Sequence, residues 1–436
     1  MKNYGRKLAP VEEEFELYQN QLEGTASIAA LMRVRGAINI HVIKQSLSLI
    51  QQRHPFLQMH IVDSKDGMYF EAEQAPEIPL RIVERNQEKQ WLEVIEEGFS
   101  QKFDSQRDLL LKVAYIPSGF GSDIFDLIFT IHHSISDGVS LIELCREFLD
   151  YCARIAAGEQ VEVEKLSLSP PIEALFPKSI TALPLRIFLF QLKFLLTQLL
   201  KKPCQFEHNV DYSLSETKCR LIHRFLNEEK TEQLCKLCKK EGTTVTGALN
   251  AAMLLACKNE LAIAGDFYLN ATIAVDIRKF LRSEFAHQQN LGFMASSFFI
   301  TEQISNNSSF WELARNSRQK IEQYLRNYQY YYLRLAAQSR IDSFKKGQFF
   351  PLSYGLSNMG QINQVSKYGS LELVENHITA CNRNPFQPYL ILHCTTFRSK
   401  MYLTLSYTEP LFSIKKAQSL MDCLMSSIDE AMGNHY

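Results

Sequence analysis

Along the chain, stretches with the hydrophobic pattern of a strand alternate with stretches whose apolar residues recur with the period of a helix. Apolar or alternating runs are typical of strands, whereas apolar residues three and four apart are typical of amphipathic helices. In the first half these patterns predict a short helix after Pro10 and further helices at residues 41–52 and 139–149. They also predict strands at residues 58–62 and 124–131. The helix at 41–52 is expected to end before Pro55, because proline disfavours helical geometry in the preceding residue.

The second half repeats this alternation. Strands are predicted at residues 219–226, 267–275, 296–300, 390–397 and 401–407, and helices at residues 228–240, 247–257, 309–335 and 414–432. A chain of 436 residues is long for one hydrophobic core and fits two domains of roughly 200 residues each. We therefore expect two similarly built α/β domains, an N-terminal one over 1–165 and a C-terminal one over 216–436, joined by a crossover over 166–215.

The crossover contains an unusually apolar segment at residues 183–200. On a helical wheel its leucines gather on one face with Phe188, while Ile187, Phe190 and Phe194 fall among the polar residues. We interpret the leucine face as core packing, and the alternatives are a cover over a lipophilic channel or contact with a membrane surface. The segment is a poor transmembrane span because it contains Arg186, Gln191, Lys193 and Gln198.

Composition and charge narrow the classes of partner. The formal net charge of -1 provides no basic excess to neutralise phosphates, so no nucleic acid is expected. With 46% hydrophobic and 22% charged residues the chain has an ordinary globular composition, and a small-molecule substrate is the default expectation. Ten cysteines without a dense framework, after an N-terminus that lacks an apolar signal region, favour a reducing compartment. We expect a cytoplasmic protein.

One cysteine group raises the question of a zinc site. Cys235 and Cys238 are closely spaced, and Cys219 and His223 lie upstream of them. Structural zinc sites usually show two tight ligand pairs joined by a loop. Here the later pair falls in a predicted helix and the earlier residues in a predicted strand, so we expect no metal site.

The residues that carry candidate chemistry lie between the strand at 124–131 and the helix that follows it. His132 and His133 stand at the strand end, where side chains are held rigidly yet can face a cleft. A neutral imidazole near pH 7 can accept a proton from a hydroxyl or an amine. Asp137 suits the positive end of the following helix, and paired with a buried cation it would brace the turn; Gly138 leaves space beside it. The alternative is a buried histidine pair in a turn, without chemistry.

The spacing His132-His133-x-x-x-Asp137-Gly138 resembles the signature of the acyltransferase superfamily that includes chloramphenicol acetyltransferase, condensation domains of nonribosomal peptide synthetases and polyketide-associated acyltransferases. The resemblance covers most of the chain, since three further segments are similar to those of stand-alone members: Asp276-Ile277-Arg278, 243–247 and Ser357-Asn358-x-Gly360. By their residues alone, these three are ordinary loops and caps. The motif typical of the plant branch is missing, which places the chain nearer the bacterial polyketide-associated and alcohol acyltransferase branch.

The resemblance implies two chloramphenicol acetyltransferase-like α/β domains that form a V around a central channel. It assigns His133 as the general base, which takes the proton from the acceptor, and His132 as a structural residue. Asp137 would pair with Arg278 or with Arg53. Arg53 belongs to a turn similar to a condensation-domain motif, although the residue alone fits a solvated helix C-terminus equally well.

The resemblance also implies the reaction. An acyl group would pass to an alcohol from a thioester of coenzyme A or of a phosphopantetheinyl carrier protein, with no bound cofactor. A donor from the second half must stabilise the oxyanion, and Ser357 and Asn358 are the candidates. The partners would be a small-molecule acceptor, an acyl carrier protein and, through 183–200, a membrane surface or the acyl chain itself. Two alternatives remain open: an amide-forming stand-alone condensation enzyme and a non-catalytic binding homologue. Each would serve lipid, polyketide or nonribosomal peptide biosynthesis.

Overall fold

The computed structural model describes residues 4–22, 26–72, 75–119, 121–177, 184–206, 212–282, 290–348, 352–383 and 389–433. Its contacts divide the chain into two compact units, each with mixed α/β structure. Unit 1 comprises Met1–Ser179, Asp276–Ala295 and Ile362–Cys381, and unit 2 comprises Ile180–Val275, Ser296–Gln361 and Asn382–Tyr436. The expected boundaries were linear, whereas this division assigns two segments from the second half of the chain to unit 1.

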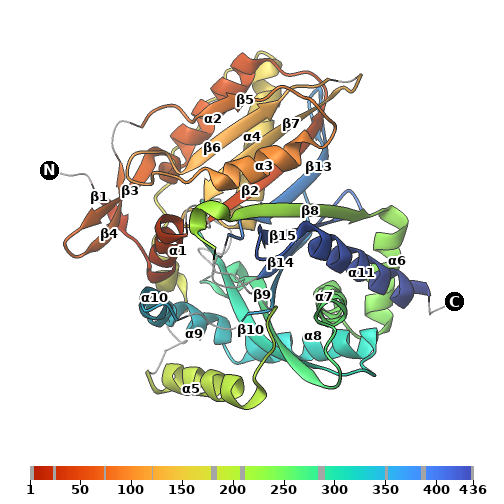
Figure 1. Ribbon diagram of the computed structural model, residues 1–436. Helices are drawn as coiled ribbons and strands as arrows, with labels where there is room; N and C mark the ends of the chain where they lie inside the picture. Colours follow the sequence, from red (N-terminus) through yellow and green to blue (C-terminus); the bar gives the residue numbers. More distant parts are fainter. Residues whose placement is uncertain are drawn as a thin grey trace. The chain divides into compact units, whose positions relative to one another are not determined.

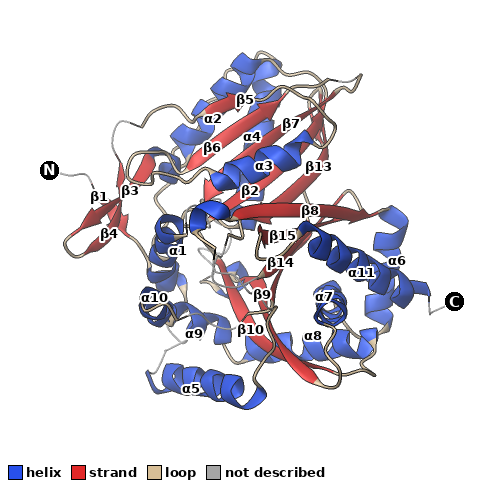
Figure 2. Ribbon diagram, in the orientation of Figure 1, coloured by secondary structure: helices blue, strands red, loops and turns tan. Residues whose placement is uncertain are grey.

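Unit 1 is built on a six-stranded sheet with the strand order β12-β13-β2-β7-β6-β5 (Figure 1). The strands are Lys367–Tyr368, Leu371–Ala380, Ser27–Arg35, Ile124–His132, Leu111–Ile116 and Leu80–Ile82 in that order. Helix α3 (Gln90–Ser100) covers one face of the sheet, and α2 (Ile40–Arg53) and α4 (Gly138–Ala156) cover the other (Figure 2). A central strand with helices on both faces must be apolar on both sides, as β7 is.

The two faces of β7 are covered by different helices. Phe129 packs edge-on against Phe148 of α4, with ring centroids 5.0 Å apart. On the opposite face, Gly98 of α3 lies so close to Thr130 that a Cβ would come within 3.2 Å of the threonine hydroxyl. Both helix layers therefore pack against β7, and this packing fixes the position of the residues at the end of the strand.

A small second sheet and a helix complete unit 1. The sheet has the order β1-β4-β3, formed by Tyr4–Lys7, Gly67–Ala72 and Met59–Ser64. Helix α1 (Pro10–Gln21) follows β1 and begins at a proline, whose missing N–H costs nothing at a helix start. This helix carries two residues that reach the histidine motif.

Unit 2 contains a six-stranded sheet with the order β10-β9-β11-β14-β15-β8. Its strands are Ala295–Ile304, Phe267–Asp276, Tyr354–Gln361, Leu390–Phe397, Lys400–Glu409 and Lys218–Leu226 in that order. Helix α7 (Val245–Leu261) packs between α8 (Phe310–Arg326) and α11 (Ile414–Gly433), and α6 (Glu228–Lys240) packs on α11 (Figure 1). Because neighbours surround α7, its sequence is apolar on nearly every side.

The sequence prediction omitted several elements of unit 1, among them α3, β5 and β6, and it differs from the structure in three further regions. The helix expected over 309–335 is interrupted, because Tyr328 adopts a left-handed conformation with φ of 55° between α8 and α9 (Gln329–Leu335), and α10 (Ala337–Lys345) follows. Ser357 and Asn358, whose residues alone fit a loop, lie inside β11. Strand β13 was not predicted; it pairs with β2 of unit 1 over most of its length.

The apolar segment forms helix α5 (Pro184–Lys201), but the expectation that its leucine face packs into the core is wrong. We define the leucine face as the exposed side chains Leu185, Phe188, Leu189, Leu192, Leu195, Leu196, Leu199 and Leu200. The opposite face is the packed one: Phe190 lies against Tyr332 and Phe194 against Phe299. A helical wheel shows two apolar faces here but cannot tell which one meets a partner.

Candidate functional site

The histidine motif occupies the junction of β7 and α4 within unit 1. His132 is the last residue of β7, Asp137 is the N-cap of α4 and Gly138 is the first residue of α4. The backbone N–H of His133 donates to the carbonyl of Ala26 over 2.7 Å, which extends the β2 pairing by one residue. The backbone at His133 is therefore held by the sheet.

The His133 ring has one nitrogen fixed and one nitrogen available. Nδ1 lies 2.7 Å from the carbonyl oxygen of Ser136. A carbonyl can only accept, so Nδ1 carries the proton and Nε2 keeps its lone pair. Among the described residues no donor or acceptor engages Nε2. This is the tautomer that a general base requires, with the proton-accepting nitrogen directed away from the turn.

Two phenylalanines clamp the His133 ring. Phe15 of α1 stacks on it, with centroids 4.5 Å apart and planes 24° apart, and Phe293 meets it edge-on at 5.1 Å. The phenylalanines also contact each other at 4.7 Å. All three rings retain partial exposure, so the clamp orients the imidazole without closing it off.

These surroundings disfavour a charged imidazole. Desolvation lowers the pKa of His133 from its usual value near 6.5 to about 4, and outweighs the opposing effects of the Ser136 carbonyl and the Asp137 charge. At neutral pH the ring is therefore uncharged and can accept a proton.

His132 has a different environment, because its side chain is fully buried. The backbone N–H of Ser134 donates to His132 Nδ1 over 3.2 Å, so the ring proton resides on Nε2. Nε2 lies 3.3 Å from a carboxylate oxygen of Glu16 on α1. The other Glu16 oxygen accepts from Asn20 over 2.6 Å and from the Ser105 hydroxyl. His132 thus joins α1 to β7 through Glu16.

Glu16 and Phe15 were not found by sequence reasoning. The helix after Pro10 was expected, but nothing in Glu14-Phe15-Glu16 distinguishes a buried carboxylate from a solvated one. Acidic residues are mostly exposed on helices, and only the fold shows that this one meets a buried histidine.

We predict that Glu16→Gln destabilises the protein by about 1 to 3 kcal/mol, because one amide oxygen can still accept from Asn20 and Ser105 while the amide N–H₂ replaces the carboxylate oxygen beside the buried His132 Nε2. Thermal unfolding measures the loss. Glu13→Gln, a half-buried position on the same helix, is the matched control and should leave the melting temperature unchanged. Equal melting of the two variants would remove Glu16 from its anchoring role.

Asp137 is the centre of a hydrogen-bond network that ties the motif to residues 276–294. Its Oδ1 accepts from the Ser140 N–H at 2.9 Å, as the α4 cap, and from Arg278 Nη2 at 2.8 Å. Its Oδ2 accepts from the Met294 N–H at 2.8 Å. Because Phe293 precedes Met294, Asp137 also fixes the ring that lies edge-on to His133.

The charges of this pair stabilise each other. Burial acts to raise the pKa of Asp137, but the charge and hydrogen bond of Arg278 outweigh burial and lower it. Burial likewise acts to lower the pKa of Arg278, whereas the Asp137 charge raises it. Arg278 also reaches Asp276 at 2.8 Å and the Ser140 hydroxyl at 2.7 Å. Both groups therefore stay ionised, and Asp137 points to its neighbours in the protein and not to a substrate.

Of the two arginines offered as partners for Asp137, the structure pairs it with Arg278 alone. Arg53, the last residue of α2, lies 3.3 Å from Glu147 of α4 and donates to the Glu164 carbonyl over 3.0 Å. His54 contacts the same carboxylate at 2.8 Å. Arg53 therefore joins α2 to α4 and is not a solvated helix end.

Ser357 and Asn358 lie in unit 2, on β11. The Asn358 amide donates to the Thr246 hydroxyl over 3.1 Å at the start of α7, and its oxygen accepts from the Gly360 N–H over 2.9 Å. These two bonds hold the Asn358 side chain in one orientation. No bond to the histidine motif is observed for either residue among the described parts of the chain.

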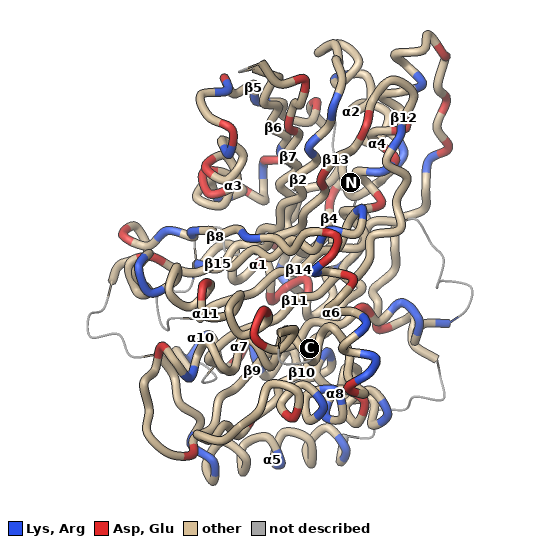
Figure 3. The backbone as a smooth tube through the Cα atoms, turned by 90° about the vertical axis from the view of Figure 1, so that its right-hand side faces the viewer, with Lys and Arg blue, Asp and Glu red and all other residues tan. Residues whose placement is uncertain are grey.

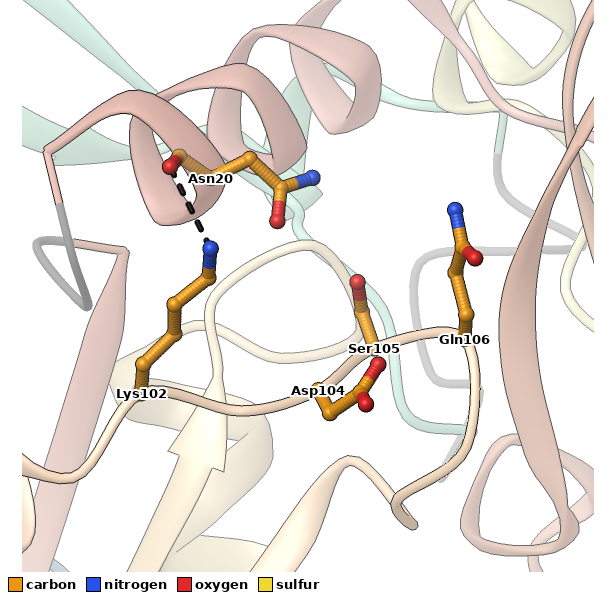
Figure 4. Close-up of a pocket in the computed structure, with 5 residues that line it drawn as sticks. All are labelled: Asn20, Lys102, Asp104, Ser105 and Gln106. Atoms are coloured by element: carbon orange, nitrogen blue, oxygen red, sulfur yellow. Dashed lines mark hydrogen bonds between the residues drawn. The ribbon is translucent and has the colours of Figure 1, made fainter.

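A pocket of about 360 Å³ in unit 1 is lined by Asn20, Lys102, Asp104, Ser105 and Gln106 (Figure 4). His133 is not among its walls, whereas Ser105 reaches Glu16, the partner of His132. The pocket therefore borders the side of the motif that contains His132.

Within the described ranges, no group of three or more His, Cys, Asp or Glu side chains is arranged to hold a metal ion.

The two sheets with helical layers and the histidine turn define the class: a two-unit α/β protein of the condensation and acyltransferase type. Residues 17–168 match the sequence model of the condensation domain, and residues 215–411 match that of the phthiocerol/phthiodiolone dimycocerosyl transferase C-terminus. The two matches lie in different halves of the chain, so each half is similar to a family of condensing or acyl-transferring proteins.

Solved structures agree with this assignment of the fold. Trichothecene 15-O-acetyltransferase from Fusarium sporotrichioides matches with a TM-score of 0.78 at 13% identity, covering 98% of this chain and 95% of the other. Polyketide synthase associated protein 5 from Mycobacterium tuberculosis matches with a TM-score of 0.72 at 15% identity, covering 99% and 100%. The epimerization domain from the third module of tyrocidine synthetase B matches with a TM-score of 0.71 at 14% identity, covering 100% and 99%.

One curated relative supports the assignment at the sequence level. Nonribosomal peptide synthetase kk1B from Curvularia clavata is 28% identical over 130 residues, which are 29% of this chain. The match spans only 1% of that much longer protein.

Proposed function

We propose that this protein transfers an acyl group from a thioester to an alcohol, with His133 as the general base. The observation that carries the proposal is the tautomer of His133, whose Nδ1 proton is bound by the Ser136 carbonyl while Nε2 is available. Acyl transfer in general is supported by the two family matches. The choice of acceptor and the assignment of the base are the proposal.

The chemistry follows from that geometry. The acceptor hydroxyl oxygen attacks the thioester carbonyl carbon as its proton moves to His133 Nε2. The C–S bond of the resulting tetrahedral intermediate then breaks, and the proton passes from Nε2 to the departing sulfur. The products are an ester and a free thiol, with no acyl group attached to the protein. Because burial disfavours a charged His133, the imidazolium returns its proton readily.

The oxyanion of the intermediate needs hydrogen-bond donors. We keep Ser357 and Asn358 as the candidates in unit 2. The Asn358 amide suits a preorganised donor, because its hydrogen bonds to the Thr246 hydroxyl and the Gly360 N–H already fix its orientation. The side chain would therefore need little reorganisation to donate to an oxyanion. For the donor substrate we propose an acyl-coenzyme A or an acyl group on a phosphopantetheinyl carrier protein.

An amide-forming condensation enzyme is the second candidate, favoured by the condensation-domain match over residues 17–168. The alcohol is preferred because the second half matches a transferase C-terminus and because a trichothecene 15-O-acetyltransferase shares the fold over 98% of this chain. A non-catalytic homologue is disfavoured, since the His133 tautomer, the Asp137 network and the phenylalanine clamp are all in place.

A substrate panel tests the proposal. The purified protein is incubated with acyl-coenzyme A donors of short and long chain, and with acylated carrier protein, each in the presence of alcohols or amines. Mass spectrometry identifies the product, and thiol release gives the rate. The expected result is ester formation that His133→Gln slows by about a hundredfold or more. Amide formation alone would favour the condensation enzyme, and no thiol release from any donor would favour the binding homologue.

We predict that kcat/KM stays constant from pH 8 down to about pH 5 and falls only as the pH approaches the His133 pKa of about 4. The sign follows from the base: above its pKa the imidazole is neutral and active, and below it the ring is protonated and inactive. The rate profile of the free protein measures this, with circular dichroism at each pH as the folding control. An acid limb centred near 6.5, the ordinary histidine value, would contradict it.

A further inference from the structure

Helix α5 carries most of the exposed large hydrophobic residues on the described part of the chain. Of the thirteen large hydrophobic residues that are exposed there, eight form the leucine face of α5. Their exposed fractions range from 37% for Leu192 to 82% for Leu200. Single exposed leucines are ordinary, but a contiguous apolar face this long indicates an interaction surface.

This face is directed outward because the other face of α5 is anchored to unit 2. Phe194 contacts Phe299, and Phe190 contacts Tyr332 of α9. Gln191 donates to the Ser339 hydroxyl over 3.1 Å, and Gln198 accepts from the Asn270 amide over 2.6 Å. The hydrogen bonds fix the rotation of α5, whose place in the chain is labelled in Figure 1, so the leucine face is a defined feature of the folded unit.

The charges of α5 have one sign. The helix and the residue after it carry Arg186, Lys193, Lys201 and Lys202 and no acidic residue (Figure 3). On a helix that turns about 100° per residue the leucine face spans roughly 140°, and Arg186 and Lys193 stand next to each other at one border of it. Both are exposed, whereas Lys201 lies over the Tyr268 ring at 4.9 Å. The apolar face is thus bordered by two cations that can reach beyond it.

We infer that α5 is an interfacial helix that binds the surface of an anionic phospholipid membrane. The leucine face would enter the boundary between head groups and acyl chains, while Arg186 and Lys193 would reach lipid phosphates from its border. Helix α5 would lie in the membrane plane, since no described helix is long and apolar enough to cross a bilayer. This inference does not rest on acyl transfer.

The charge pattern favours a membrane over a second copy of the chain. Two α5 helices joined by their leucine faces around a two-fold axis would bring the Arg186 and Lys193 pairs of both copies to one interface. The helix contains no acidic residue to neutralise them, and like charges at an interface disfavour association. An anionic lipid surface satisfies both the apolar face and the cations.

Vesicle flotation with the full-length protein tests the inference. The probes are vesicles of phosphatidylcholine alone and vesicles of phosphatidylcholine mixed with phosphatidylglycerol. We expect binding to the anionic vesicles and a reduction of at least tenfold in the triple variant Phe188→Ser/Leu195→Ser/Leu199→Ser. The matched control is Ile82→Ser/Phe225→Ser/Val365→Ser, which removes residues of similar exposure, 56 to 63% against 54 to 61%, outside α5. The control should bind like the wild type.

The charge contribution is tested separately, with variants that leave the apolar face intact. Arg186→Gln/Lys193→Gln should weaken binding to the anionic vesicles by about tenfold or more, because each cation near such a surface contributes about fivefold. Lys240→Gln/Lys415→Gln, which changes exposed lysines on α6 and α11, should have little effect beyond the general change in charge. The two glutamine variants test the membrane inference even if the α5 variant Phe188→Ser/Leu195→Ser/Leu199→Ser fails to fold.

Several results would overturn the membrane assignment. One is that the wild-type protein floats with neither kind of vesicle. Another is that the α5 variant Phe188→Ser/Leu195→Ser/Leu199→Ser is folded and floats as well as the wild type. Light scattering that shows a dimer which the serine triple converts to a monomer would assign the leucine face to a second copy. If the protein binds a carrier protein in the absence of vesicles and the α5 triple variant loses that binding, the leucine face would be assigned to the carrier protein.

Discussion

Replacement of His133 by alanine is expected to lower the rate of acyl transfer by about 10²- to 10⁴-fold, the usual contribution of a general base. The ring is held by one hydrogen bond to the Ser136 carbonyl and by contacts with Phe15 and Phe293, and it is partly exposed. Its loss removes the proton acceptor while β2 and β7 keep their pairing. The fold should therefore survive.

The measurement is kcat/KM for the best donor and acceptor from the substrate panel, with thermal unfolding in parallel. His60→Ala is the matched control, because His60 is a partly exposed histidine on β3 of the same unit, 3.5 Å from Glu71. We expect near wild-type activity for it. Activity of His133→Ala within a few-fold of the wild type would remove His133 from the mechanism and favour catalysis by positioning alone.

Asp137→Ala should cost about 3 to 5 kcal/mol of unfolding free energy, since it leaves the Arg278 guanidinium buried without its main partner. The side chains of the pair are 4% and 14% exposed, so solvent screens their interaction little. The variant also loses the α4 cap and the acceptor of the Met294 N–H. Activity should fall as well, because Phe293 is no longer held against His133.

Thermal or urea unfolding measures the loss, and an exposed ion pair is the control. Arg35 and Glu372 lie 2.8 Å apart, the same distance as Asp137 and Arg278, but are 46% and 25% exposed. Glu372→Ala should therefore cost no more than about 1 kcal/mol. In the double variant Asp137→Ala/Arg278→Ala the cost should be less than the sum of the single costs. Unchanged melting of Asp137→Ala, or strict additivity, would refute the ion-pair account.

Much of the fold was predictable because the signals that define it are local. The limits of α6 and β14 agree with the prediction to the residue, since the hydrophobic period and the flanking caps are contained in a short window. The strand, turn and helix around the histidine motif were predicted for the same reason. Asp137 could be assigned a bracing role from its place before a helix, although its partner remained a choice between Arg278 and Arg53.

The sequence by itself thus determined the two α/β halves, the position of His133 at a strand end and the family resemblance. Only the tertiary structure decided which residues surround that histidine. Glu16 and Phe15 arrive from α1 and Phe293 arrives from the second half, through contacts that span more than one hundred residues. The same holds for β13, which joins the sheet of unit 1, and for α5, whose packed face is set by Phe299, Tyr332 and Asn270. The physical reason is that periodicity shows which side chains share a face, whereas the partner of that face depends on long-range packing.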